Sequence, residues 1–256
     1  MTPYYNADGI TILHGDCREL LPRLPTPRAT ITDCPYGETS LEWDRWVQDW
    51  PSHVTGQTLW NFGSFRMYFD HAHEFKEAGW KFAQDVVWEK HNGSGPKSDR
   101  FLRVHELCAH FYRGSWSDQL QQTPTTPDAT RRAIRRKKRP PHFGNIDACA
   151  YESQDGGPRL ARSVQYFPSE HGRAEHPTPK SPGFCRLLIE YSTKPGDLVI
   201  DMFCGGGAVL LAAKQLGRRA IGIDINERWC EASARRLGQE LALRELPPIE
   251  AHGGQR

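Results

Sequence analysis

The 256-residue sequence lacks the long apolar segments of a membrane protein, and nothing in its first residues suggests secretion. No apolar run is long enough to cross a bilayer. The first residues have no basic start and no apolar stretch of the kind that signals secretion. We therefore expect a cytoplasmic protein without a membrane partner.

A strong excess of charge is also missing. The sequence holds 33 Lys and Arg residues against 31 Asp and Glu residues, which gives a formal net charge of +2. Bulk charge at this level does not attract nucleic acid, so any such affinity must come from local clusters. With 38% hydrophobic and 25% charged residues, the chain has the composition of a globular protein that can bury a full core.

The seven cysteines form no C-x-x-C pair and are spread along the whole chain. This spacing disfavours a zinc site, and the odd number disfavours a disulfide framework even more. We expect no metal, and most of the cysteines should be small buried residues.

Strands and helices alternate in the two flanks of the chain. Apolar and β-branched runs predict strands at 10–14, 29–32, 58–62, 81–89, 106–112, 197–201 and 220–224. Helical patterns predict helices at 18–24, 65–78, 183–192, 208–216 and 227–246. The strand at 197–201 shows almost no polar alternation, which is typical of a parallel sheet covered on both faces. This order predicts an α/β fold with a doubly wound, mostly parallel, Rossmann-like sheet.

The periodic pattern disappears after Gly114 and returns only near residue 176. We expect residues 1–113 and 176–246 to form one domain, 114–175 to be an inserted variable region or mobile subdomain, and 247–256 to be a flexible tail. The insertion carries the densest positive charge of the chain, in Arg131, Arg132, Arg135, Arg136, Lys137, Lys138 and Arg139. A solvated charge run is the common alternative to a binding site for such a stretch.

The second flank contains a unit typical of nucleotide binding: a strand, a glycine-rich turn, a helix, and a strand that ends in Asp224. The turn, residues 203–207, lacks the third glycine of G-x-G-x-x-G, because Val209 and Leu210 stand in its place. A P-loop motif is absent as well. A dehydrogenase and a phosphate cradle are therefore disfavoured, and the turn suits a ligand without pyrophosphate, such as S-adenosylmethionine.

In the first flank, Asp33, Cys34, Pro35 and Tyr36 directly follow the strand at 29–32. A carboxylate, a stiff proline and an aromatic ring at the carboxyl end of a strand suit the holding of a flat heterocycle by its face and its exocyclic amino group. The alternative is a simple turn with a solvated aspartate.

The order of four segments resembles the permuted, beta-group amino-methyltransferases of DNA. Residues 201–207 are similar to their cofactor motif D-P-F-x-G-S-G, and residues 33–36 to their catalytic motif D-P-P-Y. Residues 176–180 resemble H-P-T-x-K, and residues 15–17 the segment that borders the cofactor adenine. The resemblance covers roughly 8–113 and 176–240, and the chain departs from it at Cys34, Met202 and Gly206.

The resemblance implies a methyltransferase fold and S-adenosylmethionine as cofactor. The ribose would lie against Asp224, the adenine against Asp16 and Cys17, and the methionine carboxylate against Thr178 and Lys180. The full set of implied cofactor residues is Asp16, Cys17, His176, Thr178, Lys180, Asp201, Phe203, Gly205, Gly207 and Asp224.

The resemblance also implies direct methyl transfer to a base that is flipped out of duplex DNA. Asp33 and a carbonyl of Cys34 or Pro35 would hold the amino group, and Tyr36 would stack on the base. For Trp43 and Trp46 two interpretations stay open: they close the base pocket, or they make an amphipathic contact with the core. Asp33 in place of serine favours adenine N6, with cytosine N4 or RNA as alternatives and a non-catalytic nucleic-acid-binding subunit as another class. Residues 114–175 would carry target recognition, with the basic run along phosphates, and a homodimer and a cognate restriction endonuclease are compatible with this function.

Overall fold

The computed structural model describes residues 2–94, 99, 101–136, 149–170, 172 and 175–244. The predicted tail and the basic residues Lys137, Lys138 and Arg139 lie outside the described residues. The chain divides into two compact units, Met1–Gln121 with Val164–Arg256, and Gln122–Ser163.

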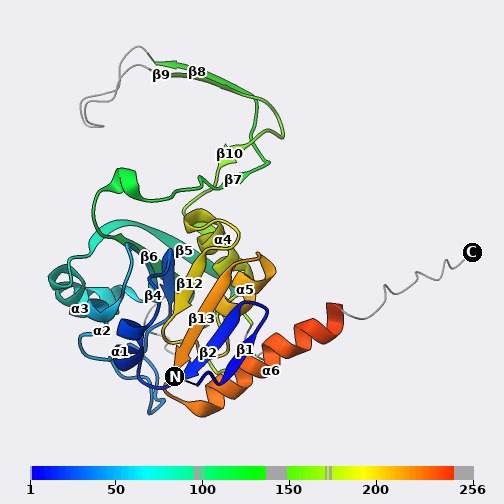
Figure 1. The fold of residues 1–256 in the computed structure, drawn as a ribbon. Helices are drawn as coiled ribbons and strands as arrows, with labels where there is room; N and C mark the ends of the chain where they lie inside the picture. Colours follow the sequence, from blue (N-terminus) through cyan, green and yellow to red (C-terminus); the bar gives the residue numbers. More distant parts are fainter. Residues whose placement is uncertain are drawn as a thin grey trace, which may run out of the picture. The chain divides into compact units, whose positions relative to one another are not determined.

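The larger unit is built on one sheet, to which the described part of the chain contributes nine strands (Figure 1). In spatial order these are β1 (Tyr5–Ala7), β2 (Ile10–His14), β13 (Arg219–Asp224), β12 (Leu198–Asp201), β3 (Ala29–Thr32), β4 (Thr58–Gly63), β6 (Arg103–Tyr112), β5 (Lys81–Ser94) and β11 (Val164–Tyr166). The central run from β2 to β4 is parallel throughout. β1 and β6 pair antiparallel with their neighbours, and β11 lies parallel to β5. The predicted mostly parallel sheet is confirmed.

Helices cover both faces of this sheet. On one face, α4 (Pro182–Ser192), α5 (Ala208–Gln215) and α6 (Glu227–Arg244) enclose a core with the inward side chains of the strands. On the other face, α1 (Cys17–Leu20), α2 (Trp50–His53) and α3 (Phe65–Glu77) enclose a second core. Along β12, Val199 joins the first core while Leu198 and Ile200 join the second. Two apolar faces explain why this strand shows no polar alternation in the sequence.

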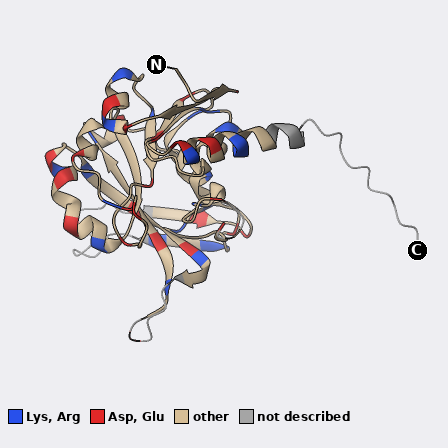
Figure 2. Cartoon of the chain, turned by 90° about the horizontal axis from the view of Figure 1, so that it is seen from below, with Lys and Arg blue, Asp and Glu red and all other residues tan. Residues whose placement is uncertain are grey.

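The helix ends follow local chemistry. Ser64 caps α3 by accepting a hydrogen bond from the Met67 amide, and Gly79 follows the helix with a φ of +81°, a conformation that glycine adopts without strain. Pro182 begins α4, where its missing N–H costs nothing. In Figure 2 acidic and basic residues alternate along α6, in keeping with the near-zero net charge.

The predicted strands and helices of the two flanks all exist, with small changes at their ends. The short helix α2 and the 3₁₀ turns η1 (Leu21–Arg23) and η2 (Trp116–Asp118) were not predicted as separate elements. Among the helices that the structure describes, none is both long enough and apolar enough to span a membrane.

The smaller unit contains two short antiparallel ribbons, β7 (Thr125–Thr126) with β10 (Arg159–Leu160), and β8 (Arg132–Arg136) with β9 (Cys149–Ser153). These strands were not predicted, because the loop-like sequence of this segment shows no strand periodicity. The predicted insertion, 114–175, is also wider than this unit, because β11 belongs to the sheet of the larger unit.

Candidate active site

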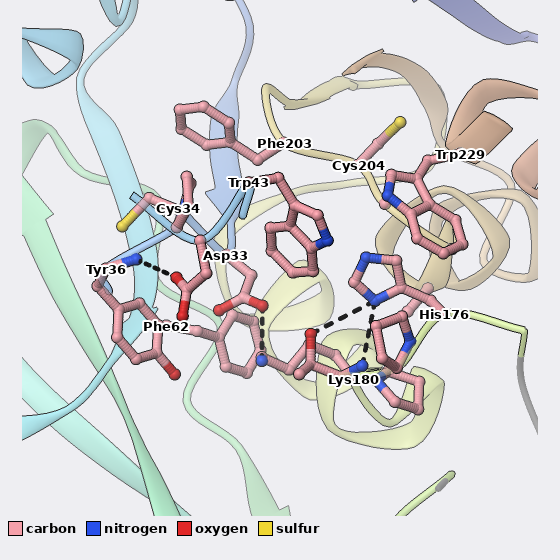
Figure 3. A pocket seen from close by; sticks show the side chains of 18 of the residues that line it. Asp33, Cys34, Tyr36, Trp43, Phe62, His176, Lys180, Phe203, Cys204 and Trp229 are labelled. Carbon is pink, nitrogen blue, oxygen red and sulfur yellow. Dashed lines mark hydrogen bonds and ion pairs between the residues drawn. The ribbon is translucent and has the colours of Figure 1, made fainter. Parts of the chain in front are cut away.

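The loops that follow β2, β3, β12 and β13 leave the carboxyl ends of parallel strands and line one cavity of about 780 Å³. Ligands of doubly wound sheets bind at this edge. The two distant segments 33–36 and 203–205 both face this cavity (Figure 3). The predicted catalytic and cofactor segments therefore share one space.

Most of the predicted site residues line the cavity. They are Asp16, Cys17, Asp33, Cys34, Pro35, Tyr36, Trp43, His176, Thr178, Lys180, Asp201, Phe203, Gly205 and Asp224. Trp46 and Gly207 are not among the lining residues.

Asp33 presents two different oxygens. Oδ2 lies 2.6 Å from Nζ of Lys180, while Oδ1 is buried and has no hydrogen-bond partner in the part of the chain that the structure describes. The side chain is 22% exposed and lines the cavity. One oxygen is thus anchored by the protein, and the other is an acceptor whose partner must come from elsewhere.

Lys180 occupies a place that its sequence motif did not predict. Its ammonium contacts Asp33 and also lies 3.1 Å from Oε2 of Glu106, which in turn pairs with Lys90. The charge of Lys180 is thus shared by two carboxylates of the protein, and its expected contact with the cofactor's carboxylate stays a prediction. Glu106 and Lys90, on β6 and β5, were missed because their strands gave no signal beyond strand periodicity.

The pKa values of Asp33 and Glu106 depend on burial and on the charges next to them. Burial raises the pKa of Asp33, Lys180 lowers it and Glu106 raises it, to a value of about 6. Burial also raises the pKa of Glu106, but Lys180 and Lys90 together lower it to about 2. Glu106 is thus held ionised by two ammonium groups, whereas Asp33 is the carboxyl whose charge depends on its surroundings.

Asp44 holds the loop that carries Tyr36. Its Oδ1 accepts hydrogen bonds from the amides of Tyr36 (2.9 Å) and Gly37 (2.8 Å), and its Oδ2 from the amide and hydroxyl of Thr39 (both 2.8 Å). Burial raises the pKa of Asp44, but these hydrogen bonds lower it by more, so the net shift is downward. The sequence did not reveal this residue, because an acid in a polar stretch gives no sign of the backbone groups around it.

Asp201 connects the end of β3 to the end of β12. Its Oδ1 accepts hydrogen bonds from Thr32 Oγ1 (2.8 Å) and from the amide of Phe203 (3.2 Å). Burial raises its pKa to about 7 in spite of these two bonds. Asp201 lines the cavity, and its contacts fix the relative positions of the ends of β3 and β12.

The cofactor side of the cavity has polar atoms left to bind a ligand. Asp224 accepts the amide of Gly205 on one oxygen and that of Asn226 on the other, both at 2.9 Å, and a carboxylate can accept about four hydrogen bonds. Nε1 of Trp229, a buried donor, has no partner among the described residues. Asp16 caps α1 and pairs with Arg18 at 2.6 Å, beside the buried Cys17. These groups fit a nucleoside with hydroxyl donors and ring acceptors.

An aromatic row crosses the cavity from the loop after β3 (residues 33–49) to α6. The ring of Trp43 lies 5.4 Å from His176, and His176 lies 4.5 Å from Trp229, edge to face (Figure 3). Burial and the charge of Lys180 lower the pKa of His176 to about 4, so it is neutral at pH 7. Thr178 donates its amide to His176 Nδ1 at 3.3 Å. Trp229 and Phe62, a further wall residue, were not predicted, because Trp229 lies in a predicted helix and Phe62 in a predicted strand without any further signal.

Trp46 does not join this row. Its ring stacks on His71 of α3 at 3.8 Å, and its Nε1 donates a 2.6 Å hydrogen bond to the buried carboxylate of Glu74. The predicted place of Trp46 in the base pocket is corrected by this contact, since Glu74 requires a donor and Trp46 supplies it.

Gly207 also acts outside the cavity. Its φ is +71°, and a Cβ there would lie 2.7 Å from Oγ of Ser233 on α6. Its glycine is required by the turn and by helix packing rather than by approach to a ligand. At Gly205, a Cβ would approach Nε2 of His176 to 3.1 Å, so this glycine lets the histidine lie on the turn.

Comparison with known proteins now identifies the chain. A family model for DNA methylases, N6_N4_Mtase, matches residues 29–235. The chain belongs to the N6/N4 DNA methylase family. It is 29% identical to the type II methyltransferase M.XycI of Xanthomonas campestris pv. cyanopsidis, over 65% of this chain and 47% of the relative, so it spans about half the length of that protein.

Two further similarities cover nearly all of the chain. It is 25% identical to the type II methyltransferase M.HinfI of Haemophilus influenzae, over 93% of this chain and 69% of the relative. The solved structure of the M1.HpyAVI–SAM complex has a TM-score of 0.63 at 22% identity, and covers 89% of this chain and 98% of that one. At this identity the structural likeness supports the fold.

We expect Asp44→Asn to loosen the loop of residues 36–39, because one amide oxygen cannot replace two charged acceptors. Hydrogen bonds to a charged group contribute about 1.5–3 kcal/mol each, so the amides of Tyr36, Gly37 and Thr39 should exchange with solvent about tenfold faster or more. Native-state hydrogen exchange measures this. Glu42→Gln, at an exposed position of the same segment, is the matched control and should change nothing; equal exchange in both variants would contradict this role of Asp44.

Proposed function

We propose that this protein transfers a methyl group from S-adenosylmethionine to the N6 amino group of adenine in duplex DNA. The observation that carries the proposal is the state of Asp33: one oxygen is anchored to Lys180, and the other is an unpaired acceptor beside a cavity shared with the cofactor turn. An arrangement of this kind is suited to take one hydrogen of an amine and to orient its lone pair.

The cofactor assignment rests on the polar atoms of the cavity and on the relatives. Asp224 has acceptor capacity for ribose hydroxyls, and Trp229 has a donor for a ring nitrogen. A solved structure similar to this chain, M1.HpyAVI, is a complex with SAM. When bound, S-adenosylmethionine supplies the activated methyl group. The residues of this chain then have to position the amine, exclude water and accept a proton.

Positioning is the main catalytic task, because the lone pair of an aromatic amine is delocalised into its ring. Asp33 Oδ1 would accept one N–H, and a carbonyl of Cys34 or Pro35 the other. As the nitrogen gains the methyl group, whose bond to the sulfonium sulfur breaks, it becomes positively charged, and the carboxylate of Asp33 stabilises that charge. The proton that the nitrogen then loses would pass to Oδ1 of Asp33. Transfer is direct, so Cys34 is not a nucleophile; its buried thiol has a raised pKa, which keeps it protonated.

The target base must leave the duplex to reach Asp33. Flipping costs a few kcal/mol, and stacking on an aromatic side chain returns roughly 1–3 kcal/mol per base. Tyr36, Trp43 and Phe62 all line the cavity and offer such faces. Asp44 supports this indirectly, because it fixes the loop from which Tyr36 projects.

The choice of adenine rests on Asp33, since serine at this position is the expectation for cytosine N4. The family includes both kinds of enzyme, so cytosine N4 is the alternative, together with an amino group in RNA. A non-catalytic subunit is disfavoured, because it would have no need for a buried acceptor beside a cofactor cavity.

DNA binding is assigned to the insertion. On β8, Arg132 and Arg135 are exposed, as is Arg131 just before it, and a basic ribbon of this kind suits the phosphates of duplex DNA. We propose that residues 114–175 carry target recognition. A homodimer and a restriction partner stay expectations of the family resemblance.

Incubation with methyl-labelled cofactor and duplex DNA, followed by digestion to nucleosides, should place the label in N6-methyladenine. Asp33→Ala should lower the rate by about 10²–10³-fold, the usual effect of removing one preorganised hydrogen-bonding group, with cofactor affinity nearly unchanged. Asp70→Ala, an exposed aspartate of α3 outside the cavity, is the control.

Each other result excludes a part of the proposal. Label in N4-methylcytosine would contradict the choice of base, and label in RNA alone would contradict the choice of nucleic acid. DNA binding with no label would indicate the non-catalytic class. Loss of cofactor binding in Asp33→Ala would refute the assignment of residues 33–36 to catalysis and of residues 201–207 to cofactor binding.

Neutralising the basic ribbon should weaken DNA binding and flatten its salt dependence. Each phosphate contact contributes roughly 0.9 to the slope of log K against log salt, so the triple variant Arg131→Gln, Arg132→Gln, Arg135→Gln should lower that slope by up to about 2.7. The control removes the same charge at Arg28, Lys194 and Arg219, which lie at the amino ends of strands, away from the cavity. An equal loss of slope in both triple variants would count against this assignment.

A further inference from the structure

Four charged side chains that line the cavity form a continuous chain of ion pairs. Lys180 Nζ lies between Oδ2 of Asp33 (2.6 Å) and Oε2 of Glu106 (3.1 Å), and Lys90 pairs with the other oxygen of Glu106. The side chain of Lys180 is only 7% exposed. Its ion pair with Asp33 is drawn in Figure 3. Two carboxylates and two ammonium groups balance, which is the condition under which buried charges are tolerated.

The surroundings of Lys180 are incompatible with a main role in holding a free carboxylate. Its ammonium already faces two carboxylate oxygens and lies 5.5 Å from the ring centre of Phe62. A third carboxylate would leave three negative groups on one ammonium, and the neighbouring Lys90 is itself paired with Glu106.

We propose that Lys180 is a positioning residue for Asp33 and not the ligand of the cofactor's carboxylate. It binds Oδ2 so that Oδ1 is the oxygen left for the base amine, and it keeps the carboxylate ionised. Glu106 holds the ammonium from the far side, and Lys90 compensates Glu106. This inference rests on the proposed function, and it assigns Lys180 to the base side of the cavity.

The geometry has a consequence for the charge of Asp33, because Lys180 and Glu106 act on it with opposite sign. Lys180 favours the ionised carboxylate, and Glu106 disfavours it. Besides these two and Lys90, the titratable groups that face Asp33 are Asp201 on β12 and the neutral Cys34, Tyr36, Cys108 and Cys185, whose pKa values are all raised by burial.

The two partners of this arrangement can be removed one at a time. In Lys180→Met the pKa of Asp33 should rise. On lowering the pH, Asp33 is then protonated earlier, and methyl transfer stops at a higher pH than in the wild type. In Glu106→Gln the full charge of Lys180 acts on Asp33, so the pKa of Asp33 should fall and the rate should persist to a lower pH. An opposite charge at this distance shifts a carboxyl pKa by about one to three units, and a like charge acts in the reverse direction.

The experiment measures single-turnover methyl transfer between pH 5 and 9, and S-adenosylmethionine affinity by calorimetry, for the whole chain and both variants. The acidic limb of the pH–rate profile should move to higher pH in Lys180→Met and to lower pH in Glu106→Gln. The affinity for S-adenosylmethionine should stay within about threefold of the wild-type value, well under the tenfold that 1.4 kcal/mol of lost contact produces. Lys214→Met is the matched control: Lys214 is also a buried lysine paired with an aspartate, Asp8 at 3.1 Å, and does not line the cavity. It should leave both measurements unchanged.

A tenfold or greater loss of cofactor affinity in Lys180→Met, with the acidic limb unmoved, would overturn the inference and assign Lys180 to the cofactor. If Lys180→Met does not fold, Glu106→Gln decides alone, because an unmoved or upward-shifted limb contradicts the arrangement.

A second measurement does not need turnover. The ¹³C carboxyl resonance of Asp33, assigned by its loss in Asp33→Asn, reports the same shifts in the absence of DNA. If the wild-type protein transfers no methyl group, but the pKa of Asp33 read from this resonance moves up in Lys180→Met and down in Glu106→Gln, the proposed function is refuted and the inference is kept. If the resonance titrates at the same pH in the wild type and in both variants, the inference is refuted.

Discussion

Lys180 and Asp33 come from opposite flanks of the chain and meet in an ion pair of 2.6 Å in the wall of the cavity. Burying two charges is costly unless they are well paired, and the pair is completed here by Glu106 and Lys90. The result is a carboxylate with one anchored and one open oxygen. The orientation of the open oxygen, and with it the proposed handling of the amine, depends on this contact.

The sheet makes the contact available. Because β3 and β12 are parallel neighbours, the loops that follow them leave the same edge, although their sequences lie far apart. Asp201 joins the two strand ends through Thr32, and Asp44 holds the catalytic loop from the other side. The aromatic row of Trp43, His176 and Trp229 then connects that loop with α6. Each part is held by backbone or buried polar contacts, which favours a preformed site.

The fold and the two main segments could be predicted because they depend on local pattern: apolar runs mark the strands, and the residues after them sit at the cavity by topology. The partners of those residues could not be predicted. Glu106, Phe62 and Trp229 read as ordinary strand or helix residues, and only the packed sheet brings them to the cavity. Trp46 was misplaced for the same reason, because its binding partner Glu74 lies on another element.

The central claim is that the open oxygen of Asp33 receives the target amine while Lys180 holds the other oxygen. A crystal structure of the protein with S-adenosylhomocysteine and a duplex that contains the methylation site tests this most directly. The account predicts the N6 nitrogen of a flipped adenine at hydrogen-bond distance, roughly 3 Å, from Oδ1, with Lys180 still on Oδ2. A complex in which Lys180 has left Asp33 for the carboxylate of the bound cofactor product would contradict it.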